Sequence, residues 1–156
     1  MKNRLLKSLG LAALLAAGAN SAGADEVWNS NVGRIIYADE IGPTTVFAYG
    51  PQEDPGVVYL LGLAKVYQNR DVYDGYWAKN KSKVECKSER PGIYGKMTKY
   101  WGRFQIKFLD NNFPSRWEAI WSYCDGPAEK VKIEATPAVG EAAVPKNDLT
   151  RQSRTP

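Results

Sequence analysis

The chain of 156 residues contains no histidine. This absence excludes Ser-His-Asp and Cys-His catalysis, zinc binding through imidazole, and any pH switch that depends on histidine. The phosphate-binding P-loop, the dinucleotide-binding glycine fingerprint and the nucleophile elbow of hydrolases are also missing. An enzyme built from this sequence would have to use carboxylates, lysines or tyrosines. We therefore expect a non-enzymatic protein that needs neither a cofactor nor a metal.

Cysteine is nearly as scarce, since only Cys86 and Cys124 are present. A reactive thiol would need a neighbouring base or a C-x-x-C arrangement, and the sequence shows neither. An even number of cysteines in an exported protein favours a disulfide bond instead. We expect one structural disulfide between these two residues.

Export is predicted from the first 24 residues. They contain an early cluster of three basic residues, an apolar run over residues 9–17 that is too short to span a bilayer, and a cleavage motif at Ala22-Gly23-Ala24. The pattern is typical of a secretory signal peptide that is cleaved after Ala24. The mature protein is expected to be periplasmic or secreted by a bacterium, with no transmembrane segment.

Removing the signal peptide also removes most of the net charge. The whole chain has 21 basic and 17 acidic residues, and three of the basic residues lie in the predicted signal peptide. The mature chain would carry a net charge of only +1. Net charge therefore gives no reason to expect a nucleic-acid partner or a general affinity for membranes.

The other end of the chain is rich in proline, alanine and small polar residues. From Thr136 onward there is no periodic apolar pattern, so this tail is expected to be disordered. One folded domain remains, over residues 25–135, which is long enough for a single modest core.

The predicted domain is all-β. Runs rich in aromatic and β-branched residues are separated by turns that contain Gly, Pro, Asn and Asp, and four strands are expected at residues 32–38, 44–49, 57–67 and 72–78. The run 57–67 could also form a helix, but Gly62 in its middle favours a strand with a bulge. This spacing indicates a small antiparallel up-and-down barrel or a sandwich.

The stretch Trp101 to Asp125 is expected to form a hairpin. Phe104, Ile106 and Phe108 alternate with polar residues, and a second strand places Trp117, Ala119 and Trp121 on one face. Pairing these two faces would bury the aromatic side chains and leave the residues between them in solvent, namely Arg103, Gln105, Lys107 and Glu118. The alternation places Cys124 on the outward face, so its disulfide is expected to hold the segment around Cys86 against the outside or the rim of the barrel.

Several short motifs resemble those of small meander barrels in the calycin and avidin-like group. Trp28 and Gly33 have the W-x4-G spacing of the first strand in these barrels. The runs "VYDGYW" and "NFPSRW" each place an aromatic residue four positions before a tryptophan. The resemblance implies an up-and-down barrel that binds a ligand or a partner. Avidins carry a serine after that glycine, whereas Arg34 stands here, so the resemblance does not extend to biotin binding.

The main functional hypothesis is a binding module of the bacterial envelope. Residues 79–107, here called the basic segment, contain nine basic and two acidic residues. The barrel mouth or this segment would bind a ligand or an anionic envelope component or protein. The candidate binding residues are Trp77, Lys79, Lys81, Lys83, Lys87, Arg90, Lys96, Lys99 and Tyr100.

Two alternatives remain open at this stage. The acidic, proline-containing loop 50–56 could insert into a cationic enzyme such as a lysozyme, which would make the protein a periplasmic inhibitor or immunity protein. The chain could instead be a hydrolase that uses a pair of carboxylates. The candidate pairs for that chemistry are Asp71/Asp74, Asp39/Glu40 and Glu53/Asp54.

Overall fold

The computed structural model describes residues 26–138. The predicted signal peptide and residues 139–156 of the predicted tail lie outside this range. Within it, no helix is both long enough and apolar enough to cross a lipid bilayer.

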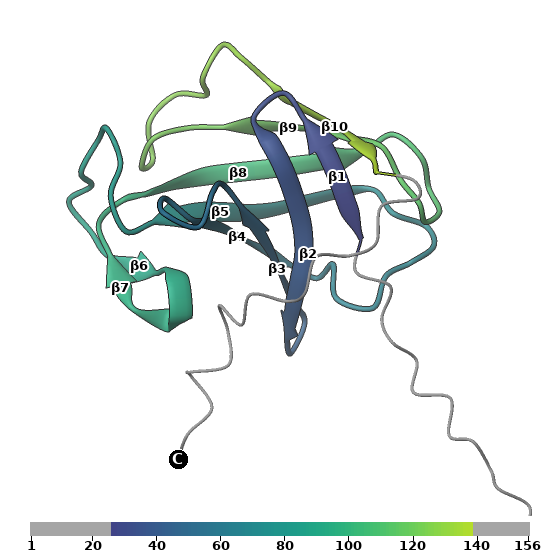
Figure 1. Cartoon of the computed structure of the whole chain (residues 1–156), viewed down its shortest axis with the longest axis horizontal. Coiled ribbons are helices and arrows are strands. Elements are labelled where there is room, and N and C mark those ends of the chain that lie inside the picture. The colour runs from purple at the N-terminus through teal and green to yellow at the C-terminus, as the bar shows by residue number, and fades with distance from the viewer. Residues whose placement is uncertain (1–25, 139–156) are drawn as a thin grey trace, which may run out of the picture.

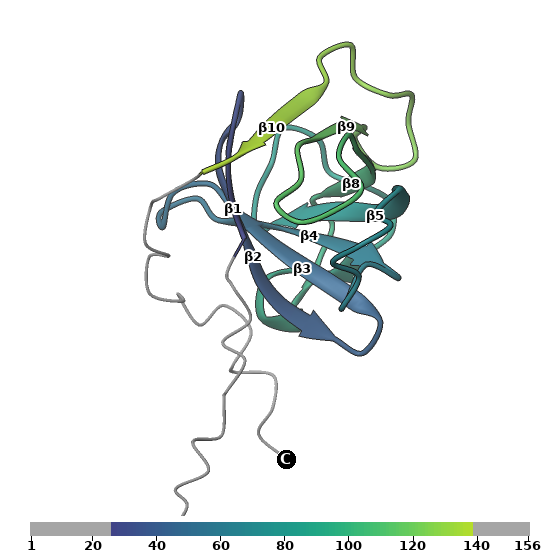
Figure 2. The same cartoon turned by 90° about the vertical axis from the view of Figure 1, so that its right-hand side faces the viewer.

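Eight antiparallel strands form a closed barrel in which each strand pairs with its neighbours in order along the chain (Figure 1). The predicted all-β up-and-down barrel is thereby confirmed. The last strand pairs with the first and closes the ring, which is visible in the view turned by 90° (Figure 2). The barrel strands are β1 (Val27–Ser30), β2 (Gly33–Ile41), β3 (Thr44–Tyr49), β4 (Gly56–Leu61), β5 (Val72–Lys79), β8 (Trp101–Phe108), β9 (Trp117–Trp121) and β10 (Ile133–Pro137).

The predicted hairpin of β8 and β9 is confirmed in its register. Phe104 pairs with Trp121, Ile106 pairs with Ala119, and Phe108 pairs with Trp117. The intervening residues of β8 are exposed. Side chains from all the barrel strands fill the interior in the same alternating way, because successive residues of a strand point to opposite faces.

Two predicted boundaries are wrong. The strand expected over 57–67 ends at Leu61, because Gly62 has a φ of 84° and turns the chain inward, so that Leu63 is buried in the core. At the other end, β10 extends beyond Ala135 into the predicted tail, because β1 offers Thr136 and Pro137 a pairing partner. Proline is tolerated there because the N–H that pairs with β1 at this point is that of Ala138, which donates to the carbonyl oxygen of Val27 at 2.8 Å.

A second layer covers part of the barrel's outer surface. Residues 80–100, here called the covering segment, contain β6 (Arg90–Pro91), the 3₁₀ helix η1 (Ile93–Gly95) and β7 (Met97–Thr98). Cys86 and Ile93 of this segment pack against outward-facing side chains of the strands, which are Val46, Val57, Ala78 and Trp101. The layer explains why Trp101, which alternates with exposed residues of β8, is itself buried.

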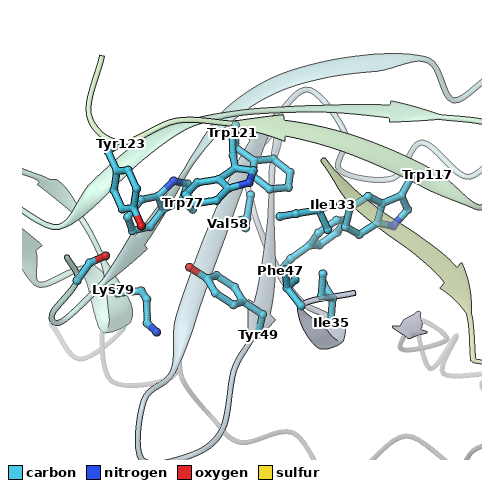
Figure 3. Close-up of a pocket in the computed structure, with 13 residues that line it drawn as sticks. Ile35, Phe47, Tyr49, Val58, Trp77, Lys79, Trp117, Trp121, Tyr123 and Ile133 are labelled. Carbon is cyan, nitrogen blue, oxygen red and sulfur yellow. The ribbon is translucent and has the colours of Figure 1, made fainter. Parts of the chain in front are cut away.

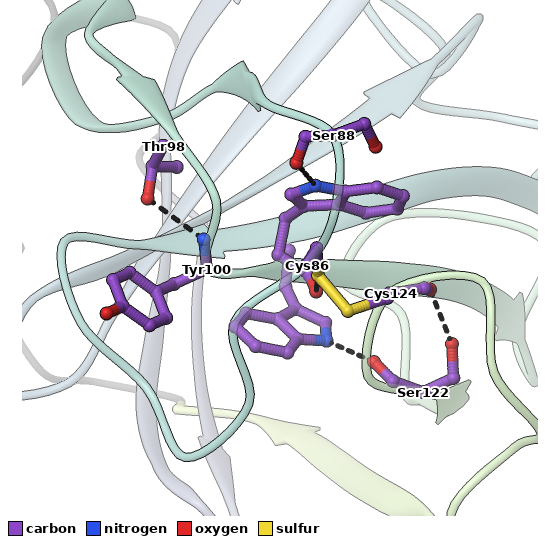
Figure 4. The surroundings of a disulfide bond; sticks show 8 residues. Cys86, Ser88, Thr98, Tyr100, Ser122 and Cys124 are labelled. Atoms are coloured by element: carbon purple, nitrogen blue, oxygen red, sulfur yellow. Dashed lines mark hydrogen bonds between the residues drawn. A yellow bond between two sulfur atoms is a disulfide. The ribbon is translucent and has the colours of Figure 1, made fainter.

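The disulfide between Cys86 and Cys124 holds this layer in place, as predicted (Figure 4). The two Cα atoms are 5.5 Å apart. Close by, the indole nitrogen of Trp101 donates a hydrogen bond to the carbonyl oxygen of Ser88 at 2.9 Å. The covering segment is therefore fixed to the barrel wall by a covalent bond, a hydrogen bond and apolar packing.

One end of the barrel, here called the closed end, is sealed by a buried ion pair. The guanidinium of Arg70 binds the carboxylate of Glu26 through two donors, and it also donates to Ser115 Oγ at 3.2 Å. The ring of Phe108 lies 5.0 Å from the guanidinium carbon. The indole nitrogen of Trp28 donates to the carbonyl oxygen of Ser115 at 2.8 Å and completes the seal.

Candidate functional site

The opposite end of the barrel, here called the open end, contains a cavity of about 230 Å³. Strands β3, β5 and β9 finish at this end and β2, β4 and β10 begin there, because neighbouring strands are antiparallel. The cavity is lined by Val32, Ile35, Phe47, Tyr49, Val58, Trp77, Lys79, Ser82, Phe104, Trp117, Trp121, Tyr123 and Ile133. Ten of these side chains are labelled in Figure 3.

Three aromatic side chains form one wall of the cavity. The ring centroids of Trp77 and Trp121 lie 6.2 Å apart, those of Trp77 and Tyr123 lie 5.8 Å apart, and those of Trp121 and Tyr123 lie 5.3 Å apart. All three pairs meet edge to face, which is a favourable arrangement for aromatic rings. The three rings therefore hold one another in place, and the wall is preformed.

The orientation of Trp77 depends on a glycine in the neighbouring strand. Its indole nitrogen donates to the carbonyl oxygen of Ser122 at 2.8 Å, across Gly102. A Cβ atom on Gly102 would lie 2.6 Å from that nitrogen and 1.7 Å from the Ser122 oxygen, so no other residue fits. The strand pairing thus fixes one of the two indole rings of the wall.

Tyr49 lies across the cavity from this wall (Figure 3). Its ring covers Gly56 on the paired strand, where a Cβ atom would come within 2.3 Å of the tyrosine Cζ. Burial raises the pKa of the Tyr49 hydroxyl above its ordinary value, and the negative charge of Asp54 adds to the rise. Tyr49 therefore stays neutral at physiological pH and presents a hydroxyl group to the cavity.

Polar groups gather at one side of the cavity. Figure 3 shows the hydroxyls of Tyr49 and Tyr123 and the ammonium of Lys79 on that side, while Phe47 and Trp117 lie on the other. Lys79 is the sole charged side chain among the lining residues, and its Nζ forms an ion pair with Asp54. The site thus combines an apolar aromatic interior with a small polar mouth.

The structure divides the predicted binding residues into two groups. Trp77 and Lys79 line the cavity at the barrel mouth, and Trp77 is buried in the barrel interior. Its place follows from the alternation of β5, in which Ala78 faces outward. The remaining residues lie in the covering segment outside the barrel: Lys81, Lys83, Lys87, Arg90, Lys96, Lys99 and Tyr100.

The members of this outer group are in different environments. The guanidinium carbon of Arg90 lies 4.2 Å from the centroid of the Trp101 ring, so Arg90 helps to hold the covering segment on the barrel. Lys99 forms an ion pair with Glu85 at 3.4 Å, and Tyr100 is half-buried. The other four lysines of the group are exposed, namely Lys81, Lys83, Lys87 and Lys96.

The three predicted carboxylate pairs lie outside the cavity, although Asp54 contacts the lining residue Lys79 through their ion pair. None of their members is among the residues that line the cavity. Glu40 accepts a hydrogen bond from the hydroxyl of Tyr37 at 2.7 Å, and Asp74 accepts one from the side-chain amide of Gln105 at 2.8 Å. Across residues 26–138, no group of three or more potential metal-binding side chains comes together. The cavity therefore offers no support for carboxylate-based hydrolysis.

Sequence reasoning missed most of the cavity wall. It placed Trp121 on a buried face, and it did not single out Tyr49 or Tyr123 as a binding residue. Alternation shows which side chains point inward, but it does not show whether they fill the interior. Their positions in the sequence could have indicated the cavity, because these aromatic residues lie at or next to strand ends that meet at the open end.

No family model matches this chain, and comparisons with curated proteins and with solved structures find no match.

Proposed function

We propose that this protein is an exported binding protein that takes up a small, largely apolar molecule in the cavity at the open end. The observation that carries the proposal is the aromatic-lined cavity of about 230 Å³ itself. Ligand sites are typically concave and apolar, with a few placed polar groups that orient the ligand. The lining residues fit that description, since Tyr49, Ser82 and Tyr123 supply hydroxyl groups among apolar walls.

The size of the cavity limits the ligand. A dry protein cavity of roughly 150 Å³ accepts benzene. A cavity of about 230 Å³ suits one or two fused rings or a branched chain of similar bulk. The preformed walls favour binding, because rings that are already fixed lose little conformational entropy when the ligand enters.

A blocked variant tests the proposal. Ser82 lines the cavity from the covering segment, so the Ser82→Trp variant should close the mouth without disturbing a strand. The probe is 2-naphthalenemethanol. We expect a Kd of roughly 10–100 μM for the wild type, because each non-hydrogen atom of such a ligand contributes about 0.5 kcal/mol of binding free energy. Isothermal titration calorimetry should show at least tenfold weaker binding to the variant.

The matched control is Ser88→Trp, which places the same side chain on an exposed position of the same segment. It should bind the alcohol as the wild type does. Equal melting temperatures for the two variants would show that both fold. Undiminished binding to Ser82→Trp would contradict the proposal.

A second candidate function rests on the exposed lysines of the covering segment. Lys81, Lys83, Lys87 and Lys96 are exposed on a segment that the disulfide holds in a fixed shape. We propose that this surface binds an anionic partner of the cell envelope, since fixed positive charges attract polyanions without the cost of ordering a loop.

Charge reversal tests this second function. Changing the four lysines to glutamate should abolish retention of the mature protein on the envelope fraction at low salt, whereas wild-type retention should fall as salt rises. The single variant Lys107→Glu, on the exposed face of β8, serves as a control for a general charge effect. Retention that is unchanged by the fourfold reversal would contradict this function.

A further inference from the structure

Lys79 is placed unusually for a surface lysine. Its side chain is 18% exposed, and among the lining residues that the structure describes it is the one with a charge. The backbone at this residue is held firmly, because its N–H donates to the carbonyl oxygen of Tyr100 at 2.9 Å and its carbonyl accepts from Thr98 Oγ1 at 2.8 Å. The backbone that carries the Lys79 side chain at the cavity mouth is therefore held in place.

The ion-pair partner of Lys79 has the opposite character. The Asp54 side chain is 61% exposed and does not line the cavity. Asp54 lies in the loop between β3 and β4, where its N–H closes a turn by donating to the carbonyl oxygen of Pro51 at 3.0 Å. Lys79 thus stands between an apolar cavity on one side and a solvent-exposed carboxylate on the other.

The ammonium group has capacity for a second anion. A lysine ammonium carries three N–H donors, and within residues 26–138 the Lys79 ammonium donates to Asp54 alone. A charged group that is mostly removed from water is stabilised by further charge-assisted hydrogen bonds. The hydroxyls of Tyr49 and Tyr123 lie on the same side of the cavity and add neutral donors (Figure 3).

We propose that the ligand of this cavity is a small apolar acid, whose ring packs between Tyr49 and Trp121 and whose carboxylate binds the ammonium of Lys79. This inference rests on the proposed ligand-binding function and names its ligand class. Asp54 then acts as a competing carboxylate that neutralises Lys79 in the empty protein. An amine of the same shape would be repelled by Lys79, and a neutral alcohol would lose the ion pair.

Three probes with one ring system and different head groups test the ligand class. They are 2-naphthoate, 2-naphthalenemethanol and 2-naphthylmethylammonium, each titrated into the mature protein by calorimetry at pH 7. We expect 2-naphthoate to bind about fivefold more tightly than the alcohol, because its carboxylate adds an ion pair with Lys79 that is only partly shielded from solvent. The ammonium probe should bind most weakly.

Variants of the ion pair assign the preference to Lys79. Lys79→Met keeps the apolar stem and should weaken binding of the acid more than binding of the alcohol, so that the preference for the acid disappears. Asp54→Asn removes the competing carboxylate and should tighten binding of the acid about threefold without affecting the alcohol. The controls are Lys81→Met and Glu53→Gln, exposed neighbours of the two residues.

The outcomes separate this inference from the proposed function. If the alcohol binds and the acid binds no more tightly, the acid-ligand inference is overturned and the proposed function stands. The same holds if Lys79→Met weakens the acid and the alcohol equally. If none of the three probes binds, both are overturned.

Discussion

The Arg70→Met variant is expected to lose about 3–5 kcal/mol of unfolding free energy, because it leaves the buried carboxylate of Glu26 without a partner. Both side chains of this pair are almost completely removed from solvent at the closed end. Arg70 also donates to the carbonyl oxygen of Val66 at 2.8 Å and to Ser115, so its loss leaves further acceptors unsatisfied. Urea denaturation followed by tryptophan fluorescence measures the change.

Two comparisons show whether the cost comes from the unpaired charge. The Glu26→Gln/Arg70→Met double variant removes both charges and should recover a large part of the loss. Arg116→Met breaks an exposed pair with Asp110 and should cost far less than Arg70→Met, because solvent screens exposed ion pairs. A loss for Arg70→Met no larger than that for Arg116→Met would mean that the ion pair does not seal the closed end.

The disulfide is expected to contribute a similar amount. Cys86 and Cys124 are 38 positions apart, and closing a loop of that length stabilises a fold by about 4 kcal/mol on the chain-entropy estimate. The Cys86→Ser/Cys124→Ser variant should therefore have a much lower urea midpoint than the wild type. The mechanism is the release of the unfolded chain from a constraint, so the effect should not require any change in the barrel.

Reduction of the wild-type protein provides the matched measurement. The reduced wild type should unfold at the same urea concentration as the double serine variant. Hydrogen exchange should rise first in the covering segment, at amides such as that of Cys86, which donates to the carbonyl oxygen of Lys99 at 2.8 Å. A loss below about 1 kcal/mol would show that the packing of Ile93 and Trp101 alone holds the segment.

The two ends of the barrel differ, and the difference explains how one fold can be stable and still have space for a ligand. At the closed end, the interior is filled by Leu63, Phe108 and the Arg70–Glu26 pair. At the open end, the side chains stand against the walls and leave space between them. A barrel of eight strands is wide enough either to be filled by side chains or to hold one small ligand, and this chain does each at one end.

Much of the barrel could be predicted from the sequence because strand alternation is a local property. The pattern of β8 and β9 fixed which faces are buried, and the predicted strand 44–49 coincides with β3. The outward parity of Cys124 correctly placed the covering segment outside the barrel. These features depend on neighbouring residues and on one covalent bond.

The parts that sequence reasoning missed depend on distant partners. The last two residues of β10, Thr136 and Pro137, read as tail, and they belong to the strand because β1 pairs with them across the closure of the barrel. The cavity likewise depends on whether inward side chains from separate strands meet, which no local pattern records. Trp77 could be named as a binding residue from the sequence, but the sequence left open whether it belongs to the barrel mouth or to the basic segment.

The central claim is that the space at the open end accepts a small apolar molecule. A crystal structure of the mature protein with 2-naphthalenemethanol tests it most directly. We expect the ring of the ligand between Tyr49 and Trp121, with the hydroxyl of the ligand on the side of Lys79. A second pocket lies on the outside of the barrel beside Tyr59 and Tyr76. The claim would be contradicted by a ligand seen only in that outer pocket, with the barrel interior closed by its own side chains.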